Sequence, residues 1–501
     1  MSGVSGVGDP AATAGGAEKA RLRAWWWHRQ GLDGRLRGAR PDAVLAETGW
    51  ARSVGGSGPY LGLFARAGTD RAAVDGAVAR LEIHELPSAR GCTYVLPAAD
   101  YALGLRVGAS APEADLAAAV KHLGVTEREI DALGTAVLGA LTAAGAPLGP
   151  TALKKVVGPA VRSLGEAGRK RGVTTTLPLA LGLLQARGAI RRVPVNGRLD
   201  QQRYGYVRWL PSPLGERTST GPGRTGDVPE RLSGDAGPDR AEAAPVSLPS
   251  PTAGPDGSTE AVPDVGRDAA RSAADRVRAE LARRYFAWAG PASLRHFRWF
   301  SNLTAAATKT AVAGLGLVPL PDPAPVPDGS STGAVLLATP EQAAALADFA
   351  VPKQPQYALL AGNDGIHLLH RDFGRLLDPA DADRAVPGGK PGSVLDALSD
   401  SPTHMILDRG RLVGLWEYDP DAAAIVWTSF IRPDAALRAA VATTEMFIRD
   451  QLGDARSFSL DSPKSRAPRI AALRKGGYVM AACVTAAWSM SMCLARLCLS
   501  V

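Results

Sequence analysis

The chain has 501 residues, of which 46% are hydrophobic and 21% are charged. This length exceeds what one hydrophobic core usually serves, so we expect two to four domains with substantial cores rather than a disordered chain. Lys and Arg number 57 against 49 Asp and Glu, which gives a formal net charge of +8. That balance favours a polyanionic partner such as nucleic acid.

The cysteines and the two ends of the chain narrow the class of protein further. The spacing of the four cysteines fits no zinc site, so we predict no metal, no cofactor and a reducing cytoplasm. Residues 1–17 lack a positive region followed by an apolar core, which predicts a disordered lead rather than a signal peptide. The apolar tail, residues 476–501, is at the lower limit for a membrane span. We expect a tail helix or a divergent end there, and no membrane segment.

Residues 18–110 form the first expected module. It opens with three tryptophans at 25–27, a run that is usually half-buried in a core although such rings can stack on bases. The glycine-rich segment 55–58 lacks the Lys-Ser or Lys-Thr of a phosphate-binding loop, which favours a turn. His84 and Glu85 could supply acid-base chemistry, but a single such pair before a proline is more often structural.

Residues 111–210 contain the strongest pattern in the chain. Apolar residues between 153 and 161 have the spacing of a short helix, and a basic connection at 169–172 follows. Thr174, Thr175 and Thr176 offer N-cap hydroxyls to a leucine-rich helix that Gly188 ends. This second helix has the position expected of a recognition helix.

A basic hairpin follows that helix. Asn196-Gly197 favours a two-residue turn between strands over 189–195 and 199–209, because both turn residues tolerate positive φ. Helices followed by a two-stranded ribbon are the order of a winged helix, so the hairpin is the expected wing. Its arginines face only Asp200 and could neutralise several phosphates, although such arginines can also serve solubility alone. The predicted DNA-binding residues are Arg169, Lys170, Arg171, Thr174, Thr175, Thr176, Arg191, Arg192, Arg198 and Arg203.

The second half of the chain begins after a break in composition. Residues 211–270 are rich in Pro, Gly and Ser without periodicity, which predicts a disordered linker. In residues 271–345, an amphipathic helix over 273–288, helices over 292–300 and 304–315 and a strand from 316 give a second winged-helix candidate.

Residues 346–475 are expected to form a β-rich C-terminal domain. Short apolar runs at 357–360, 366–369, 404–407, 412–418 and 425–427 alternate with turn signals, which predicts a small antiparallel sheet or barrel. A last helix is expected over 433–451. The predicted fold class is therefore α+β, with tandem winged-helix modules and a β-rich C-terminal domain.

Several segments occur in an order that resembles a known family. They are 44–54, 59–66 and 90–100 in the first module, 288–293 in the third, and Gly414-Leu415-Trp416 near the C-terminus. This order resembles the bacterial winged-helix DNA-binding proteins grouped with the YcaQ and AlkZ DNA glycosylases, over most of residues 20–475 apart from the linker. The resemblance implies three tandem winged helices with a concave DNA-binding surface. It also implies enzymes that unhook interstrand crosslinks and excise N7-alkylated purines.

The sequence departs from that family at its catalytic motif, which is Gln, a hydrophobic residue, then Gln or Asp. Trp50, Ala51 and Arg52 occupy the matching positions, and Tyr94 replaces a histidine of the family. Glycosidic cleavage passes through an oxocarbenium-like state that an amide or carboxylate oxygen can stabilise, whereas indole and guanidinium groups accept no such hydrogen bond. Trp50 and Arg52 are thus the catalytic candidates only by position, and the sequence leaves enzymatic activity open.

Three hypotheses follow. The first is a winged-helix protein that binds duplex DNA mostly independently of sequence, in connection with DNA damage or repair. The alternative is a DNA glycosylase that excises N7-alkylated or crosslinked bases, and the third is a transcription regulator with a ligand-sensing C-terminal domain. Each predicts double-stranded DNA as the partner. We further expect a monomer without a small-molecule cofactor, in the cytoplasm and associated with the nucleoid.

Overall fold

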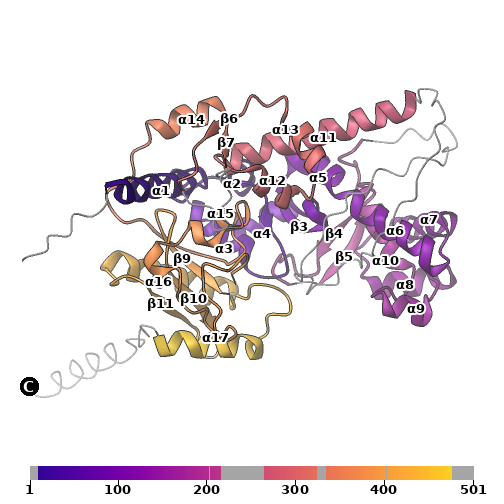
Figure 1. Ribbon diagram of the computed structural model, residues 1–501. Coiled ribbons are helices and arrows are strands. Elements are labelled where there is room, and N and C mark those ends of the chain that lie inside the picture. Colours follow the sequence, from indigo (N-terminus) through magenta and orange to yellow (C-terminus); the bar gives the residue numbers. More distant parts are fainter. Residues whose placement is uncertain (1–9, 202, 216–264, 324–334, 402, 477–501) are drawn as a thin grey trace, which may run out of the picture.

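The structure is a computed structural model that describes residues 10–201, 203–215, 265–323, 335–401 and 403–476. Helices and small antiparallel sheets are mixed along the chain, so the protein is α+β (Figure 1). Most of the expected linker and nearly all of the apolar tail lie outside the described residues. Within the described ranges, no helix is long and apolar enough to cross a membrane.

The N-terminal helix α1 (Pro10–Arg29) carries the tryptophan run into the interior. It begins inside the segment 1–17 that we expected to be disordered, so that expectation is wrong from Pro10 onward. Trp25 and Trp26 donate through Nε1 to the carbonyls of Gly290 and Pro291, at 3.0 and 3.1 Å. All three indoles are buried. They therefore belong to the core and cannot stack on bases in this structure.

The first unit is built around a three-stranded antiparallel sheet with the order β1-β3-β2. Asp70 caps α4 by accepting from the backbone N–H of Ala73 at 2.7 Å, and Gly68 ends α3 in the left-handed region. The elements are α2 (Pro41–Thr48), β1 (Ala51–Arg52), α3 (Gly58–Ala67), α4 (Arg71–Ala79), β2 (Ile83–Pro87) and β3 (Thr93–Pro97). Helices α5 (Tyr101–Gly108) and α6 (Ser110–Leu123) lead out of this unit.

The second unit has a similar order with one additional helix before its hairpin. Its elements are α7 (Glu127–Ala144), α8 (Pro150–Val157), α9 (Gly165–Lys170), α10 (Leu177–Ala186), β4 (Ile190–Pro194) and β5 (Tyr204–Arg208). Thr126 and Glu129 form a capping box at the start of α7. A bridge between Leu148 and Tyr206 adds a third strand position to the hairpin.

Helix α10 differs from the recognition helix that we expected. It contains no charged residue, and its leucines are buried against α6 and α7. Thr176 is fully buried, and its hydroxyl accepts from the backbone N–H of Arg162 at 3.1 Å instead of capping α10. Because its apolar residues fill the core on most sides, α10 presents no polar face that could read base edges.

The expected two-residue hairpin is also wrong in its strand bounds. Asn196-Gly197 does form a turn, with Gly197 at φ 76°, but β4 ends at Pro194 and β5 begins at Tyr204. Between them, Leu199 is buried in the core of the first unit, where its backbone N–H donates to the Tyr60 hydroxyl at 3.0 Å. This burial pulls the loop onto the protein body and prevents the strands from continuing to the turn.

The third unit has the same order again. Its elements are α11 (Val265–Ala289), α12 (Leu294–Ser301), α13 (Ala305–Val312), β6 (Val318–Leu320) and β7 (Leu336–Ala338), and α14 (Pro340–Ala347) follows. A bridge between Ala292 and Leu337 takes the place that the Leu148 bridge has in the second unit. The helices α12 and α13 and the strand β6 lie close to their predicted bounds, but α11 begins eight residues before the predicted residue 273. The end of the segment 211–270, which we expected to be disordered, is therefore helical from Val265 onward.

The C-terminal part is a four-stranded antiparallel sheet with the order β11-β10-β9-β8. Its strands are β8 (Tyr357–Leu360), β9 (His404–Asp408), β10 (Arg411–Asp419) and β11 (Ala424–Ser429). Helix α16 (Ala435–Phe447) packs on one face and α17 (Pro463–Gly476) on the other. The run 366–369, which we expected as a strand, is instead the short helix α15 (Gly365–Leu368), because Asp364 caps it.

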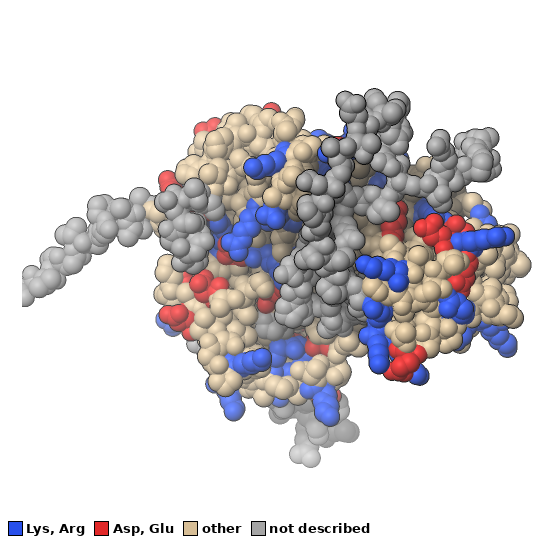
Figure 2. All heavy atoms as spheres, turned by 45° about the vertical axis from the view of Figure 1, so that its right-hand side comes forward, with Lys and Arg blue, Asp and Glu red and all other residues tan. Residues whose placement is uncertain are grey.

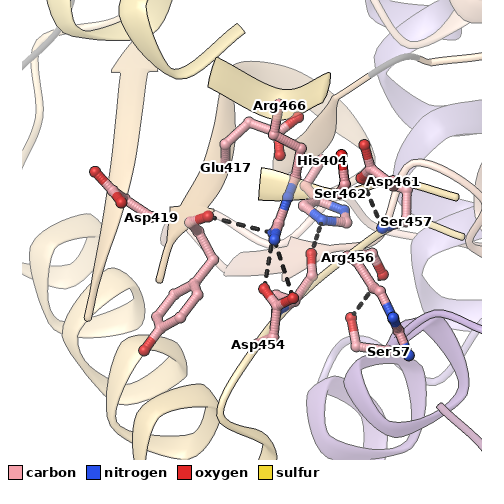
Figure 3. Close-up of polar contacts among 12 residues, drawn as sticks. Ser57, His404, Glu417, Asp419, Asp454, Arg456, Ser457, Asp461, Ser462 and Arg466 are labelled. Atoms are coloured by element: carbon pink, nitrogen blue, oxygen red, sulfur yellow. Dashed lines mark hydrogen bonds and ion pairs between the residues drawn. The ribbon is translucent and has the colours of Figure 1, made fainter. Parts of the chain in front are cut away.

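A buried polar network joins this sheet to the first unit (Figure 3). Arg466, whose side chain is 0% exposed, binds both carboxylate oxygens of Asp454 at 2.7 and 2.9 Å. Next to it, the Arg456 carbonyl accepts from the backbone N–H and the hydroxyl of Ser57, at 3.0 and 3.2 Å. Gly56 permits this approach, since a Cβ there would lie 2.4 Å from the same carbonyl oxygen. The glycine-rich segment 55–58 is thus a turn through which the first unit contacts the C-terminal part.

Candidate functional site

The motif positions of the sequence lie on β1, at an edge of the first sheet. Arg52 pairs directly with Tyr94 across to β3, and Ala51 pairs with Val95. Residues that pair in this way point to the same face of a sheet, while consecutive residues point to opposite faces. Arg52 and Tyr94 therefore share one face of the sheet, and Ser53 faces the other.

Trp50 lies in the core between the first and third units. Its side chain is 4% exposed, and its Nε1 donates to Asp100 at 2.9 Å. The ring packs against Trp288 and Tyr94, with centroid distances of 5.4 and 6.1 Å. Trp50 therefore joins two units and does not face a ligand.

Arg52 is half-buried, and its guanidinium makes few contacts with other side chains. Its guanidinium carbon lies 5.5 Å from the centre of the Tyr94 ring. One guanidinium nitrogen, Nη1, is buried without a hydrogen-bond partner among the described residues. The motif position thus presents a positive charge, where the family presents a hydrogen-bond acceptor.

Arg90 lies near Arg52, and both Arg90 and Arg371 contact the Trp299 indole. The guanidinium carbons of Arg90 and Arg371 are each 4.4 Å from the centre of the Trp299 ring, and Arg90 also donates to the Trp299 carbonyl at 3.1 Å. Arg371 forms an ion pair with Asp400. Burial lowers the pKa of Arg90, and the positive charges of Arg371 and Arg52 lower it further, although Tyr94 opposes them. These groups form a basic and aromatic cluster.

A carboxylate occupies the opposite face of the same sheet. Glu85 is 4% exposed, and its Oε1 accepts from the Ser53 hydroxyl at 2.5 Å. Its other oxygen, Oε2, is buried without a hydrogen-bond partner among the described residues. Arg192 lies nearby; burial opposes its charge, but Tyr206 and Glu85 raise its pKa overall. Glu85 is therefore a buried carboxylate on the strand β2, with one oxygen bound by Ser53 and the other unpaired among the described residues.

His84 does not act together with Glu85. Burial lowers the pKa of His84 to about 3, and the charges of Arg191 and Arg192 lower it further. The ring packs against Trp209 at 5.2 Å. His84 is therefore a neutral core residue at physiological pH.

The predicted DNA-binding residues do not form one patch. Arg169, Lys170, Thr174 and Arg203 are exposed, Arg171, Thr175, Arg191, Arg192 and Arg198 are half-buried, and Thr176 is buried. Arg169 is paired with Glu166 at 2.6 Å, and Arg198 is tied to Asp200 and to the Leu452 carbonyl. Helix α9 lies at the outer end of the second unit, whereas β4 and β5 lie nearer the centre (Figure 1). Basic and acidic side chains are intermingled on the face in Figure 2.

Comparison with known proteins identifies the family. The model of the AlkZ-like DNA glycosylase family matches residues 51–445. The chain belongs to the AlkZ-like DNA glycosylase family. This confirms the resemblance seen in the sequence.

A solved structure, the Streptomyces sahachiroi DNA glycosylase AlkZ, has a similar fold. Its TM-score is 0.55 at 18% sequence identity, covering 88% of this chain and 98% of that chain. No curated protein matches the chain. Because the family consists of DNA glycosylases, the match favours the glycosylase hypothesis over plain DNA binding.

In this AlkZ-like chain, sequence reasoning missed Arg90, Arg371 and Trp299 as neighbours. Arg90 lies in a segment that supports the family resemblance, but no pattern connects it with α12 or with the loop after α15. Among the described residues, no three His, Cys, Asp or Glu side chains come together as a metal site would require.

Proposed function

We propose that this protein is a DNA-repair glycosylase that binds duplex DNA and excises alkylated bases. The family match, which runs from β1 into α16, carries this proposal. It covers most of the three repeated units and the sheet that holds Glu85. The basic excess of the chain is consistent with a duplex partner.

We interpret the three repeated units as tandem winged helices. Each has a helix, a short strand or bridge, further helices and a hairpin, and these elements lie within 41–97, 127–208 and 265–338. Exposed cations such as Lys170 and Arg203 are suited to phosphate contacts that position DNA without reading its sequence. A monomer that works in the cytoplasm, associated with the nucleoid, is part of this proposal.

The chemistry assigned to Glu85 is general-base catalysis. Alkylation at N7 makes a purine cationic, so the base leaves as a neutral molecule when the bond from C1′ to N9 breaks. Water adds to C1′, and the Glu85 carboxylate takes its proton, which yields an abasic site and the free base. The Ser53 hydroxyl occupies Oε1 and leaves Oε2 for the water. Trp50 and Arg52 have no part in this step because neither accepts a hydrogen bond.

The test is strand cleavage by alkali after incubation with a duplex that contains one N7-methylguanine. We expect strand breaks with the wild type and their loss in Glu85→Gln. Glu82→Gln is the matched control. Glu82 lies just before β2 and forms an ion pair with Arg80 at 3.0 Å. Absence of breaks at a large excess of wild-type protein rules out excision of this lesion.

A second candidate is duplex binding without excision. It is favoured by the buried Trp50 and the guanidinium of Arg52, which replace the acceptors of the family motif. In that case, salt-dependent binding to undamaged DNA of arbitrary sequence persists while no breaks form. Preference for one operator sequence would instead indicate a transcription regulator.

A further inference from the structure

The basic cluster brings together four segments that are distant in sequence. Arg52 comes from β1, Arg90 from the 3-10 turn η1 (Ala89–Gly91), Trp299 from α12 and Arg371 from the loop after α15. Tyr94 lies beneath Arg52. All four segments are half-buried at this point. The cluster is thus a junction of the first unit, the third unit and the C-terminal part.

The charges in this junction are not balanced. Arg371 is paired with Asp400, but no described carboxylate forms an ion pair with Arg52 or Arg90. The guanidinium carbons of Arg90 and Arg371 each lie 4.4 Å from the centre of the same indole ring. A single arginine would satisfy the ring as a cation–π partner. The additional like charges repel each other, more strongly in a half-buried place than in water.

Two other features of the cluster, its backbone conformation and its unpaired donors, are also unfavourable without a bound anion. Arg90 and Arg371 both have positive φ, 59° and 46°, which non-glycine residues rarely adopt. Nη1 of Arg52 and Nε1 of Trp299 are buried donors without a partner among the described residues. The fold therefore maintains a strained, positively charged group of donors that a bound anion would relieve.

We propose that Arg52, Arg90 and Arg371, together with the Trp299 indole N–H, bind a phosphate group. The planar guanidinium fork matches the oxygens of phosphate, and three such groups can surround it. The phosphate comes either from a DNA backbone or from a free phosphate compound. Only the DNA source rests on the proposed function. Because Ser53 and Glu85 lie on the opposite face of the sheet, loss of excision leaves this proposal intact.

Inorganic phosphate is the first probe. We expect phosphate to raise the thermal unfolding midpoint of the full chain above that in sodium chloride of equal ionic strength. Arg90→Gln should weaken phosphate binding about tenfold or more, since it removes charge-assisted hydrogen bonds. Arg52→Gln should have the same effect and is safe for folding, because the Arg52 side chain makes no hydrogen bond in the described structure. Arg298→Gln, an exposed arginine next to Trp299, is the matched control and should respond like the wild type.

Duplex binding at several salt concentrations identifies the source of the phosphate. If the cluster holds a DNA phosphate, Arg52→Gln should lower the slope of log affinity against log salt by about 0.9, and duplex should compete with inorganic phosphate. If the ligand is a free phosphate compound, the phosphate response is lost in the variants while duplex affinity is unchanged. The proposal is overturned if phosphate and chloride act alike on the wild type and the variants bind duplex normally.

Discussion

Removal of Arg66 tests how much one buried ion pair between the first unit and the C-terminal part contributes to the stability of the protein. Arg66 on α3 binds both carboxylate oxygens of Asp364 at 2.8 Å, and the two side chains are 5% and 4% exposed. Arg66 also donates to Gln30 Oε1 at 2.9 Å and to the Gly62 carbonyl at 3.1 Å. Asp364 in turn caps α15. The pair thus connects α3, α15 and Gln30, the residue that follows α1.

Arg66→Met leaves the Asp364 carboxylate buried without its counterion. Breaking a buried pair in this way costs about 3–5 kcal/mol, whereas an exposed pair contributes about 0–1 kcal/mol. We expect the first unfolding transition in urea, followed by circular dichroism, to move to lower urea by an amount in the buried range. Asp364→Asn added to Arg66→Met should restore part of the loss, because it removes the uncompensated charge and keeps a capping oxygen.

Arg40→Met is the control for this experiment. Arg40 is 66% exposed and paired with Asp42 and Glu82, so its loss should change stability by about 0.5 kcal/mol or less. If Arg66→Met costs less than about 1 kcal/mol, the pair behaves as a surface pair and the reasoning is wrong.

Three further predictions concern pH and the loop between β4 and β5. Burial raises the pKa of Glu417 to about 7, so its stabilising contribution is complete below the unfolded pKa of 4.5 and is lost as pH rises through 7; Glu417→Gln should flatten this fall in urea titrations. Burial lowers the pKa of His404 to about 4, so stability is lost as pH falls from 6.5 through 4, and His404→Gln should lose less over that range. Arg203→Gln should reduce the salt slope of duplex binding by about 0.9. Arg198→Gln should leave that slope unchanged, because Arg198 is held by Asp200.

Local patterns predicted the second and third helices of the third unit well. The helices around 294–301 and 305–312 follow short-range signals, since Ser293 and Thr304 cap them. The same holds for the turn at Asn196-Gly197. By contrast, the loop that follows this turn is decided by Leu199, which enters a core formed by another unit. The residues that Leu199 contacts are far from it in the sequence, so no local pattern predicts its burial.

The candidate site shows the same limit. The position of Arg52 beside Tyr94 could be expected from the family resemblance, because both residues lie in matched segments. The approach of Arg371 to Trp299 depends on how the C-terminal part packs on α12, which no local pattern encodes. Likewise, the burial of α10 follows from its position between α6 and α7 and not from its own leucines alone.

The central claim is that Glu85 excises an alkylated base from duplex DNA. The most direct test is the rate at which free N7-methylguanine is released from a duplex under single-turnover conditions, measured by chromatography. We predict release by the wild type and a rate at least about 100-fold lower in Glu85→Gln, the effect expected for loss of a general base. No release by the wild type, or equal release by Glu85→Gln, would contradict the account.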